Sequence, residues 1–270
     1  MSYEHILFSE ADGVATLTIN RPQVLNALHT GVIAEMIHAV DRVRDEGTAR
    51  VLLLTATGRA FCSGADLSGG GAGAAPEPAH LKAKLPDAGK VLETHFNPLM
   101  ERLFALPVPL ITAVNGAAAG AGCSYGLAGD IVIAAKSAYF LQAFVNIGLV
   151  PDVGSTWLLP RLAGKARAQA MMMLGERIKA ETAFDWGMIY QVVDDEALME
   201  TANALAARLA KGPTQAYALI RQGIRDCMDV SMTEGLMIER RNQRAAGRTA
   251  DFAEGVTAFL QKRPANFSGK

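Results

Sequence analysis

Residues 51–67 read VLLLTATGRAFCSGADL, and residues 110–130 read LITAVNGAAAGAGCSYGLAGD. Each stretch begins with a short apolar run typical of a buried strand, continues through a glycine-containing loop and ends in a helical pattern. The runs IVIAA at residues 131–135 and QVV at residues 191–193 predict two further strands in the same rhythm. Strands that alternate with helices predict an α/β fold.

The chain before these stretches adds a hairpin and a helix. HILFSE at residues 5–10 and VATLTIN at residues 14–20 alternate apolar and polar positions around an Asp-Gly pair, which predicts a β-hairpin. Over residues 25–43 apolar side chains recur at helical spacing, and Gly47 follows as a stop signal. We therefore expect one amphipathic helix there.

Toward the C-terminus the pattern is helical only. Breaks are expected near Gly212-Pro213, Ser231 and Gly247. Such helices must bury their apolar faces against the core or against another subunit. We predict a core over residues 1–194 and a helical region over residues 195–270.

The composition is typical of a globular protein with a small-molecule partner. Of 270 residues, 50% are hydrophobic and 20% are charged, which is enough for a buried core. The formal net charge of -1 creates no field toward nucleic acid or anionic lipid. No apolar run is long enough to span a membrane, and the first residues carry charges where a signal peptide would be apolar. We expect a cytoplasmic protein with no nucleic acid or membrane partner.

No metal or disulfide framework is expected. Cys62, Cys123 and Cys227 are odd in number and widely spaced, and the five histidines lack metal-ligand spacing. Residues 68–78, SGGGAGAAPEP, show no periodicity and predict a mobile loop. This loop is either a surface insertion or a flap beside a functional site.

The motif GAGCSYG at residues 120–126 invites comparison with a dinucleotide-binding turn. Three residues precede its last glycine where the usual pattern has two, and no acidic residue closes a following strand. We therefore do not expect a nicotinamide cofactor.

The two glycine loops share a different feature. In each, a strand delivers backbone N–H groups to the start of a helix, where the helix dipole favours negative charge. Two such donors aimed at one oxygen form an oxyanion hole. Ordinary tight strand-to-helix turns would produce the same pattern, and physical reasoning alone favours that simpler interpretation.

Residues 20–28 (NRPQVLNAL), residues 58–67 (GRAFCSGADL) and residues 114–130 resemble, in order and spacing, the signature segments of the enoyl-CoA hydratase/isomerase (crotonase) superfamily. The resemblance continues to the closing AFLQKRPANFSGK. It implies a crotonase (ClpP-like) spiral of ββα units with a helical C-terminal trimerisation region. It also implies an acyl-CoA thioester as substrate, no separate cofactor, and a homotrimer or homohexamer.

The resemblance further implies the residues of the site. The backbone N–H groups of Ala65 and Ala121 stand at the positions of the oxyanion-hole donors. The first two signature segments are implied to line the nucleotide and pantetheine path, and the C-terminus to reach the adenine and phosphates of CoA from a neighbouring subunit. The implied substrate contacts are Val24, Leu25, Ala27, Ser63, Ala65, Asp66, Leu67, Gly122, Ser124, Phe144, Phe267 and Lys270.

Hydratases of this superfamily carry two glutamates that activate water, and the matching positions here are Ser124 and Phe144. Neither side chain can act as a carboxylate base. Asp152, in GLVPD, stands where the hydratases usually have glycine, and the resemblance implies that it is the catalytic base. The alternative is that Asp152 caps the helix that runs through Trp157.

Other acidic residues have structural interpretations. We expect Asp66 to cap the helix after the first glycine loop and Asp130 to end a helix. Asp194 and Asp195 are expected to start the next helix.

The segments AAGAG, GLVPD, DWGMIYQVVDDE and AAGRTADF are similar to those of ring-1,2-epoxyphenylacetyl-CoA isomerases and of related 3-enoyl to 2-enoyl-CoA isomerases. These groups are implied to use an aspartate at the position of Asp152. The implied function is isomerisation through a stabilised enolate and proton transfer. Ser124-Tyr125 and Ser155, which replaces a common glycine, depart from the pattern.

Two other functions remain as alternatives. The first is a hydratase that recruits water without the usual glutamates. The second is a non-catalytic binder, for example of RNA, but the near-neutral charge and the lack of a basic patch interleaved with aromatic residues argue against RNA.

Overall fold

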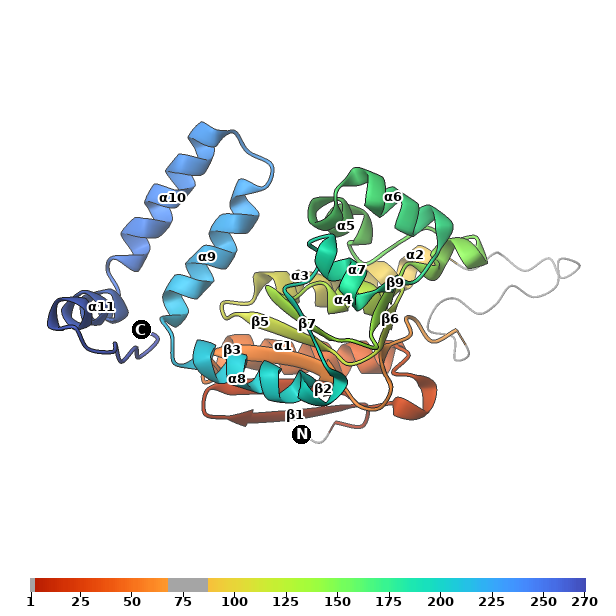
Figure 1. Cartoon of the computed structure of the whole chain (residues 1–270), viewed down its shortest axis with the longest axis horizontal. Coiled ribbons are helices and arrows are strands. Elements are labelled where there is room, and N and C mark those ends of the chain that lie inside the picture. The colour runs from red at the N-terminus through yellow and green to blue at the C-terminus, as the bar shows by residue number, and fades with distance from the viewer. Residues whose placement is uncertain (1–2, 68–86) are drawn as a thin grey trace, which may run out of the picture.

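The computed structural model describes residues 3–67 and 87–270, which form two β-sheets among helices, with a helical arm at one end (Figure 1). The loop predicted at residues 68–78 lies outside the described residues. Within the described ranges, no helix is long and apolar enough to cross a bilayer.

The larger sheet has six strands in the order β1-β2-β3-β5-β7-β10. Strands β1 and β2 pair antiparallel, and the remaining pairs are parallel. Asp12 and Gly13 join β1 to β2 with φ of 51° and 76°, the left-handed values that a tight type I′ turn needs. The predicted hairpin is therefore confirmed. The strands are β1 (Ile6–Ala11), β2 (Val14–Ile19), β3 (Val51–Ala56), β5 (Leu110–Val114), β7 (Ile131–Ala135) and β10 (Gln191–Val193).

A second sheet holds short strands in the order β4-β6-β8-β9. Strands β3, β5 and β7 are each followed along the chain by one of these short strands, so the chain turns from one sheet into the other. Because β4 and β6 pair in parallel, the loops that follow them emerge at the same edge. The strands are β4 (Ala60–Cys62), β6 (Ala117–Ala119), β8 (Tyr139–Leu141) and β9 (Ile178–Lys179).

The first long helix is α1 (Thr30–Glu46), although the apolar pattern begins at Leu25. Asn26 interrupts the helix with a left-handed φ of 56°. Its buried side-chain Nδ2 donates to the carbonyl oxygens of Thr57 and Ala60 at 2.8 and 2.7 Å. The segment before α1 is thereby tied to the turn between β3 and β4. The helix begins at Thr30, so the prediction that it begins at Leu25 is wrong.

The core lies around β3 and β5, in which every residue is buried. Strands covered on both faces read as continuous apolar runs, which is why the sequence pattern predicts them well. The helical segments in this part of the chain are η1 (Pro22–Val24), α2 (Ala88–Val91), the π-helical turn η2 (Leu92–Phe96), α3 (Asn97–Ala105), α4 (Ala121–Gly126), η3 (Ala143–Ile147), α5 (Ser155–Ala163), α6 (Lys165–Leu174) and α7 (Ala180–Asp185).

After β10 the described chain is helical, with breaks at the three predicted places. Helix α8 packs against β3, β5 and β7, whereas α9, α10 and α11 form the arm at one end of the molecule (Figure 1). The division at residue 194 stays a prediction. Helix α8 follows that residue in sequence but packs against the sheet, not with the arm. The elements are η4 (Asp195–Ala197), α8 (Leu198–Ala210), α9 (Thr214–Cys227), α10 (Met232–Ala246) and α11 (Ala250–Gln261).

Asp130 does not end a helix, because α4 already ends at Gly126. Its carboxylate accepts a hydrogen bond from Leu110 N at 2.7 Å and lies 2.6 Å from Nε of Arg221 on α9. Asp130 therefore ties the sheet to the arm. The helical segment predicted to start at the Asp194-Asp195 pair is present as η4.

Candidate active site

A cavity of 230 Å³ lies where the loops after β4 and β6 meet η2 and η3. Its lining is apolar except for the side chains of Ser63, Asn146 and Asp152, and Asp152 alone among these described residues ionises. The described residues that line it are Ser63, Gly64, Ala65, Leu67, Val91, Leu92, Phe96, Gly120, Ala121, Ala143, Phe144, Asn146, Ile147, Leu149 and Asp152.

The two predicted donors both line this cavity. Ala65 follows β4, where its neighbours Gly64 and Asp66 exchange backbone hydrogen bonds of 2.8 Å with Leu28. Ala121 is the first residue of α4, so its N–H has no partner within the helix. Within the described part of the chain, neither N–H donates to a backbone acceptor. Both amides are thus available to an oxygen in the cavity.

Glycines hold the two loops together. A Cβ on Gly122 would lie 2.7 Å from Cys62 Sγ, and a Cβ on Gly64 would lie 3.1 Å from the Ala119 carbonyl oxygen. Gly64 also has a φ of 101°, which L residues rarely adopt. Gly122 was predicted to contact the substrate, but it is buried against Cys62 and does not line the cavity. Its role is to let the loops approach each other.

Asp152 lies between η3 and α5 with its carboxyl group at the cavity. Its Oδ1 is buried and makes no hydrogen bond within the described structure. Burial raises the pKa of Asp152 to about 6, because the charged form loses hydration. A carboxyl group in this state can accept and return a proton near neutral pH.

The backbone beside Asp152 argues against a capping role. The N-cap of α5 is Gly154, and Asp152 contributes only its carbonyl oxygen, which accepts from Ser155 N at 3.0 Å. The helix-cap alternative is therefore wrong. Val153 has a φ of 48°, which is strained for a β-branched residue. Strain of this kind is typical of functional sites.

Phe144 lines the cavity as predicted, but Ser124 does not. Ser124 is buried on α4, and its Oγ lies 2.6 Å from Ser155 Oγ. The hydroxyl of Ser124 is turned away from the cavity into a buried polar cluster, and its predicted contact with the substrate stays a prediction.

The predicted contacts near the first signature segment are only partly in the cavity. Ser63 and Leu67 line it, whereas Val24, Leu25 and Ala27 do not. Leu25 lies next to the site, since its carbonyl oxygen accepts from Ser63 N at 3.0 Å.

Asp66 lies beside the cavity without lining it. Its Oδ2 is 3.2 Å from Arg21 Nη1, and this ion pair links the segment before α1 to the loop after β4. The helix that Asp66 was predicted to cap would fall outside the described residues.

The C-terminal pair lies far from the cavity in a single chain. Phe267 packs beside Gly255 of α11, and the carbonyl oxygen of Lys270 accepts from Asp251 N at 3.1 Å. Figure 1 places α11 and the C-terminus at the opposite end of the molecule from α2 and β6. A contact of these residues with CoA requires a second subunit and stays a prediction.

Sequence reasoning missed most of the apolar wall. Val91 ends α2, Leu92 and Phe96 come from η2, and Ile147 and Leu149 come from η3 and the turn after it. Apolar residues carry no chemical signature in sequence, and only folding brings them to one cavity.

The thiols near the site are not nucleophiles. Cys62 and Cys123 are fully buried, and burial raises the pKa of each thiol to about 12. Both therefore stay protonated at neutral pH. Among residues 3–67 and 87–270, no group of three or more His, Cys, Asp or Glu side chains could hold a metal ion.

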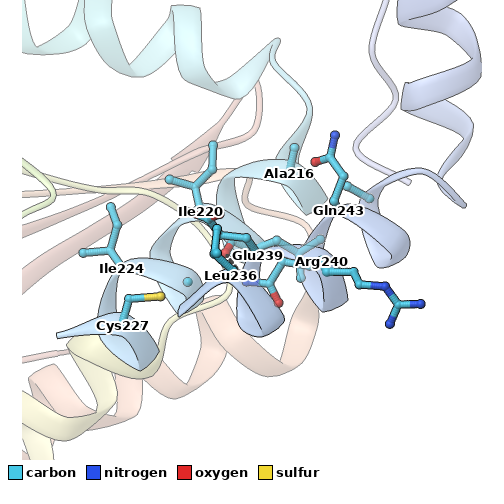
Figure 2. A pocket seen from close by; sticks show the side chains of 12 residues that line it. Ala216, Ile220, Ile224, Cys227, Leu236, Glu239, Arg240 and Gln243 are labelled. Atoms are coloured by element: carbon cyan, nitrogen blue, oxygen red, sulfur yellow. Dashed lines mark hydrogen bonds between the residues drawn. The ribbon is translucent and has the colours of Figure 1, made fainter. Parts of the chain in front are cut away.

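A larger groove of 730 Å³ runs between α9 and α10. Figure 2 shows Ile220 and Ile224 of α9 and Leu236 of α10 along it, with Glu239 and Arg240 further along α10. Among the residues that the structure describes, it shares no lining residue with the cavity at Asp152. This groove is a helix-pair surface of the arm rather than part of the site.

The sequence matches the Enoyl-CoA hydratase/isomerase family over residues 9–270. The chain belongs to this family. It is 49% identical to a 1,2-epoxyphenylacetyl-CoA isomerase of Escherichia coli, over 99% of both chains. It is 32% identical to a 2,3-dehydroadipyl-CoA hydratase of the same species, over 98% of this chain and 99% of the relative. A crystal structure of an enoyl-CoA hydratase from Bacillus anthracis has a TM-score of 0.89 at 30% identity, covering 99% of this chain and 100% of that one.

The predicted crotonase fold is confirmed. The relatives named above include both an isomerase and hydratases. At the two positions where the resemblance implies the glutamates of the hydratases, this chain has Ser124 and Phe144. Ser124 is buried behind the cavity and Phe144 forms part of its wall. Asp152 is left as the one carboxylate among the described lining residues.

Proposed function

We propose that this enoyl-CoA hydratase/isomerase is an acyl-CoA isomerase that acts on 1,2-epoxyphenylacetyl-CoA and also moves the double bond of 3-enoyl-CoA to the 2-position. The observation that carries the proposal is Asp152, a half-buried residue whose buried Oδ1 has no hydrogen-bond partner in the described structure, in an apolar cavity with two backbone donors. A single base beside an oxyanion site is sufficient for proton transfer. The relative with 49% identity supports the epoxide substrate.

In this mechanism the thioester oxygen binds between the N–H groups of Ala65 and Ala121. Removal of the α-proton places negative charge on that oxygen, and each donor then stabilises the enolate. In a cavity that excludes water, one such donor contributes about 3 kcal/mol to lowering the barrier.

Asp152 takes the α-proton as a carboxylate and becomes a neutral acid. With a 3-enoyl substrate the electron pair spreads over a dienolate, and the acid returns the proton to the γ-carbon, which leaves the conjugated 2-enoyl product. With the epoxide the same α-proton removal opens the route to an oxepin, and the proton returns along the conjugated ring system. No atoms are gained or lost, so no cofactor is needed.

The pKa of Asp152, raised to about 6 by burial, suits this double role. An ordinary aspartate, whose pKa is lower, would return the proton readily but would be a weaker base for removing it in the first step. A pKa nearer to neutrality lowers the cost of taking the α-proton and still leaves a carboxyl group acidic enough to return it.

Hydration is the alternative, because relatives with about one-third identity are hydratases. A panel of 3-enoyl-CoA, crotonyl-CoA and 1,2-epoxyphenylacetyl-CoA, followed by ultraviolet absorbance and mass, separates the two. Isomerisation of 3-enoyl-CoA gains the absorbance of a conjugated thioester at constant mass. Hydration of crotonyl-CoA loses that absorbance and adds the mass of water. Turnover of crotonyl-CoA alone would refute the isomerase proposal.

The assembly belongs to the same proposal: a homotrimer or homohexamer, in the cytoplasm, with Phe267 and Lys270 as contacts to CoA across a subunit interface. Support comes from large apolar side chains that a single chain leaves exposed on α10 and α11. They include Met232, Leu236, Met237, Phe252, Phe259 and Leu260. Native mass spectrometry tests this assembly, and a fully active monomer would refute it.

A further inference from the structure

Three buried polar side chains lie behind the base. Gln142 is 0% exposed, and Ser124 and Ser155 are each 1% exposed. Gln142 Nε2 donates to Ser155 Oγ at 3.0 Å, and the two serine hydroxyls are 2.6 Å apart. None of the three lines the cavity. They form a hydrogen-bonded chain inside the protein that no step of the proposed mechanism uses.

Gln142 donates at one end of this chain, and either serine hydroxyl can be the donor between Ser155 and Ser124. Ser155 Oγ accepts from Gln142, so its own proton is free to go to Ser124 Oγ. The Ser124 proton then has two backbone acceptors within reach, the carbonyl oxygens of Asp152 at 3.4 Å and Gly120 at 3.5 Å. The chain therefore ends between two carbonyl groups.

These two carbonyl groups belong to the two halves of the site. The Gly120 carbonyl is in the same planar peptide as the Ala121 N–H, so a partner on one fixes the direction of the other. The Asp152 carbonyl belongs to the same residue as the carboxyl group that acts as the base. A single hydroxyl, that of Ser124, thus lies between the oxyanion peptide and the base segment.

We infer that Ser124, Ser155 and Gln142 are positioning residues that hold Asp152 at a set distance from the Ala121 N–H. The inference rests on the proposed function. Both serines are departures from the related isomerase pattern, and the structure places these two departures in direct contact.

Simple core packing does not account for the cluster. Gln142 Oε1 is buried without a partner among the described residues, which costs stability that an apolar side chain would avoid. The next residue after Asp152, Val153, keeps a strained φ of 48° that the surroundings must enforce. A buried hydrogen-bonded cluster specifies one arrangement of such a backbone better than apolar contacts do.

The test is a double-mutant cycle of Ser124→Ala, Ser155→Ala and the pair, with Thr55→Val as matched control. Thr55 is also buried, and its hydroxyl donates to the Ala113 carbonyl oxygen at 2.9 Å, away from the cavity. Each serine variant should lower kcat for 3-enoyl-CoA on the order of tenfold to a hundredfold, with KM nearly unchanged. The double variant should be no slower than the slower single variant, since each change breaks the same chain.

A second readout follows the Asp152 carboxyl directly by carbon-13 NMR titration. The ionisable group that interacts with Asp152 in the described structure is Tyr125, whose hydroxyl donates to the Phe96 carbonyl oxygen and whose pKa is raised well above the usual range by burial. Tyr125 thus stays neutral, and the titration reports Asp152 alone. Loosening the segment should admit water and move the midpoint below about 6 in both serine variants.

The inference is overturned if the serine variants keep wild-type kcat, if their effects multiply in the double variant, or if Thr55→Val loses as much activity. If the wild-type enzyme isomerises no thioester, the proposed function fails by itself. The NMR titration then decides the positioning role: a lowered midpoint in both serine variants but not in Thr55→Val supports it, and an unchanged midpoint overturns it.

Discussion

The two glycine loops and the segment that carries Asp152 supply the same cavity by opposite means. The loops present backbone N–H groups at Ala65 and Ala121, and their geometry depends on the close approach at Gly122. The Asp152 segment presents a side chain whose Oδ1 has no partner in the described structure. Side-chain identity therefore matters little at the donors. It matters at the glycine that packs the loops and at the base.

The sharpest way to break this comparison is Asp152→Asn. The amide has the shape of the carboxyl group but cannot accept the proton, so we expect isomerisation to fall by about 10³- to 10⁴-fold. Affinity for an acyl-CoA should change little, because both loops stay intact. Turnover of 3-enoyl-CoA and binding by calorimetry measure the two effects. In heavy water, the wild type should label the α or γ position and the variant should not.

Stability gives a control for Asp152→Asn. Since the folded pKa is raised to about 6 from 3.8, folding is favoured most below pH 3.8, and that advantage is lost as pH rises through about 6. Asparagine removes the cost of burying the charge, so the variant should be more stable than wild type at pH 8 by roughly 3 kcal/mol. Near-wild-type isomerase and exchange rates in a folded Asp152→Asn would show that Asp152 is not the base.

The loops are tested by Gly122→Ala. The added Cβ would meet Cys62 Sγ at 2.7 Å, so one loop must move away from the other and the two donors no longer converge. We expect kcat to fall on the order of tenfold to a hundredfold and stability to fall by about 1–3 kcal/mol.

Gly126→Ala is the matched control in the same helix. Its added Cβ would meet Phe61 Cε1 at 3.4 Å and Val114 Cγ2 at 3.5 Å, which is close to ordinary contact. This variant should keep kcat within about threefold of wild type. Equal losses in the two glycine variants would mean that the helix, not the loop contact, is what matters.

The pH dependence is the next smaller effect. Below about pH 6 the base is protonated in the free enzyme, so kcat/KM should fall about tenfold per pH unit there and level off above. A stopped-flow profile between pH 4.5 and 8.5, with ranges set by the substrate's own stability, measures it. A second inflection in the free enzyme would require another ionisable group in the cavity.

The same contrast explains what the sequence predicts and what it does not. Strands β3 and β5 are buried on both faces, so they appear as continuous apolar runs and were found. The glycine loops were recognisable because their residue types and order resemble those of a family. Strands β4 and β6 have three residues each, too few for any periodicity, and the turn from one sheet to the other was missed.

In the site, the catalytic base is easier to predict from the sequence than the contacts of the residues around it. Asp152 stands out as a carboxylate in an apolar segment, whereas the inward turn of Ser124 toward Ser155 depends on two segments that meet only in the fold. The same holds for Asn26. Its side chain donates hydrogen bonds to the turn between β3 and β4, and the predicted first turn of the helix does not form. Contacts between distant residues leave no local pattern to read.

The smallest expected effect separates the loop backbone from its side chains. Cys62 and Cys123 are buried thiols with pKa raised to about 12, so neither supplies a thiolate. Cys123→Ala and Cys62→Ala should each keep kcat within about fivefold and lose about 1 kcal/mol of stability to the small cavity left behind. Cys62→Ala should be the more sensitive of the two, because its sulfur also accepts from Gly64 N at 3.4 Å. Thermal melts measure the stability, and turnover and CoA binding are measured on the same preparations. If either variant folds and binds CoA but loses turnover completely, a thiol takes part in the chemistry and the contrast between backbone loops and a side-chain base is wrong.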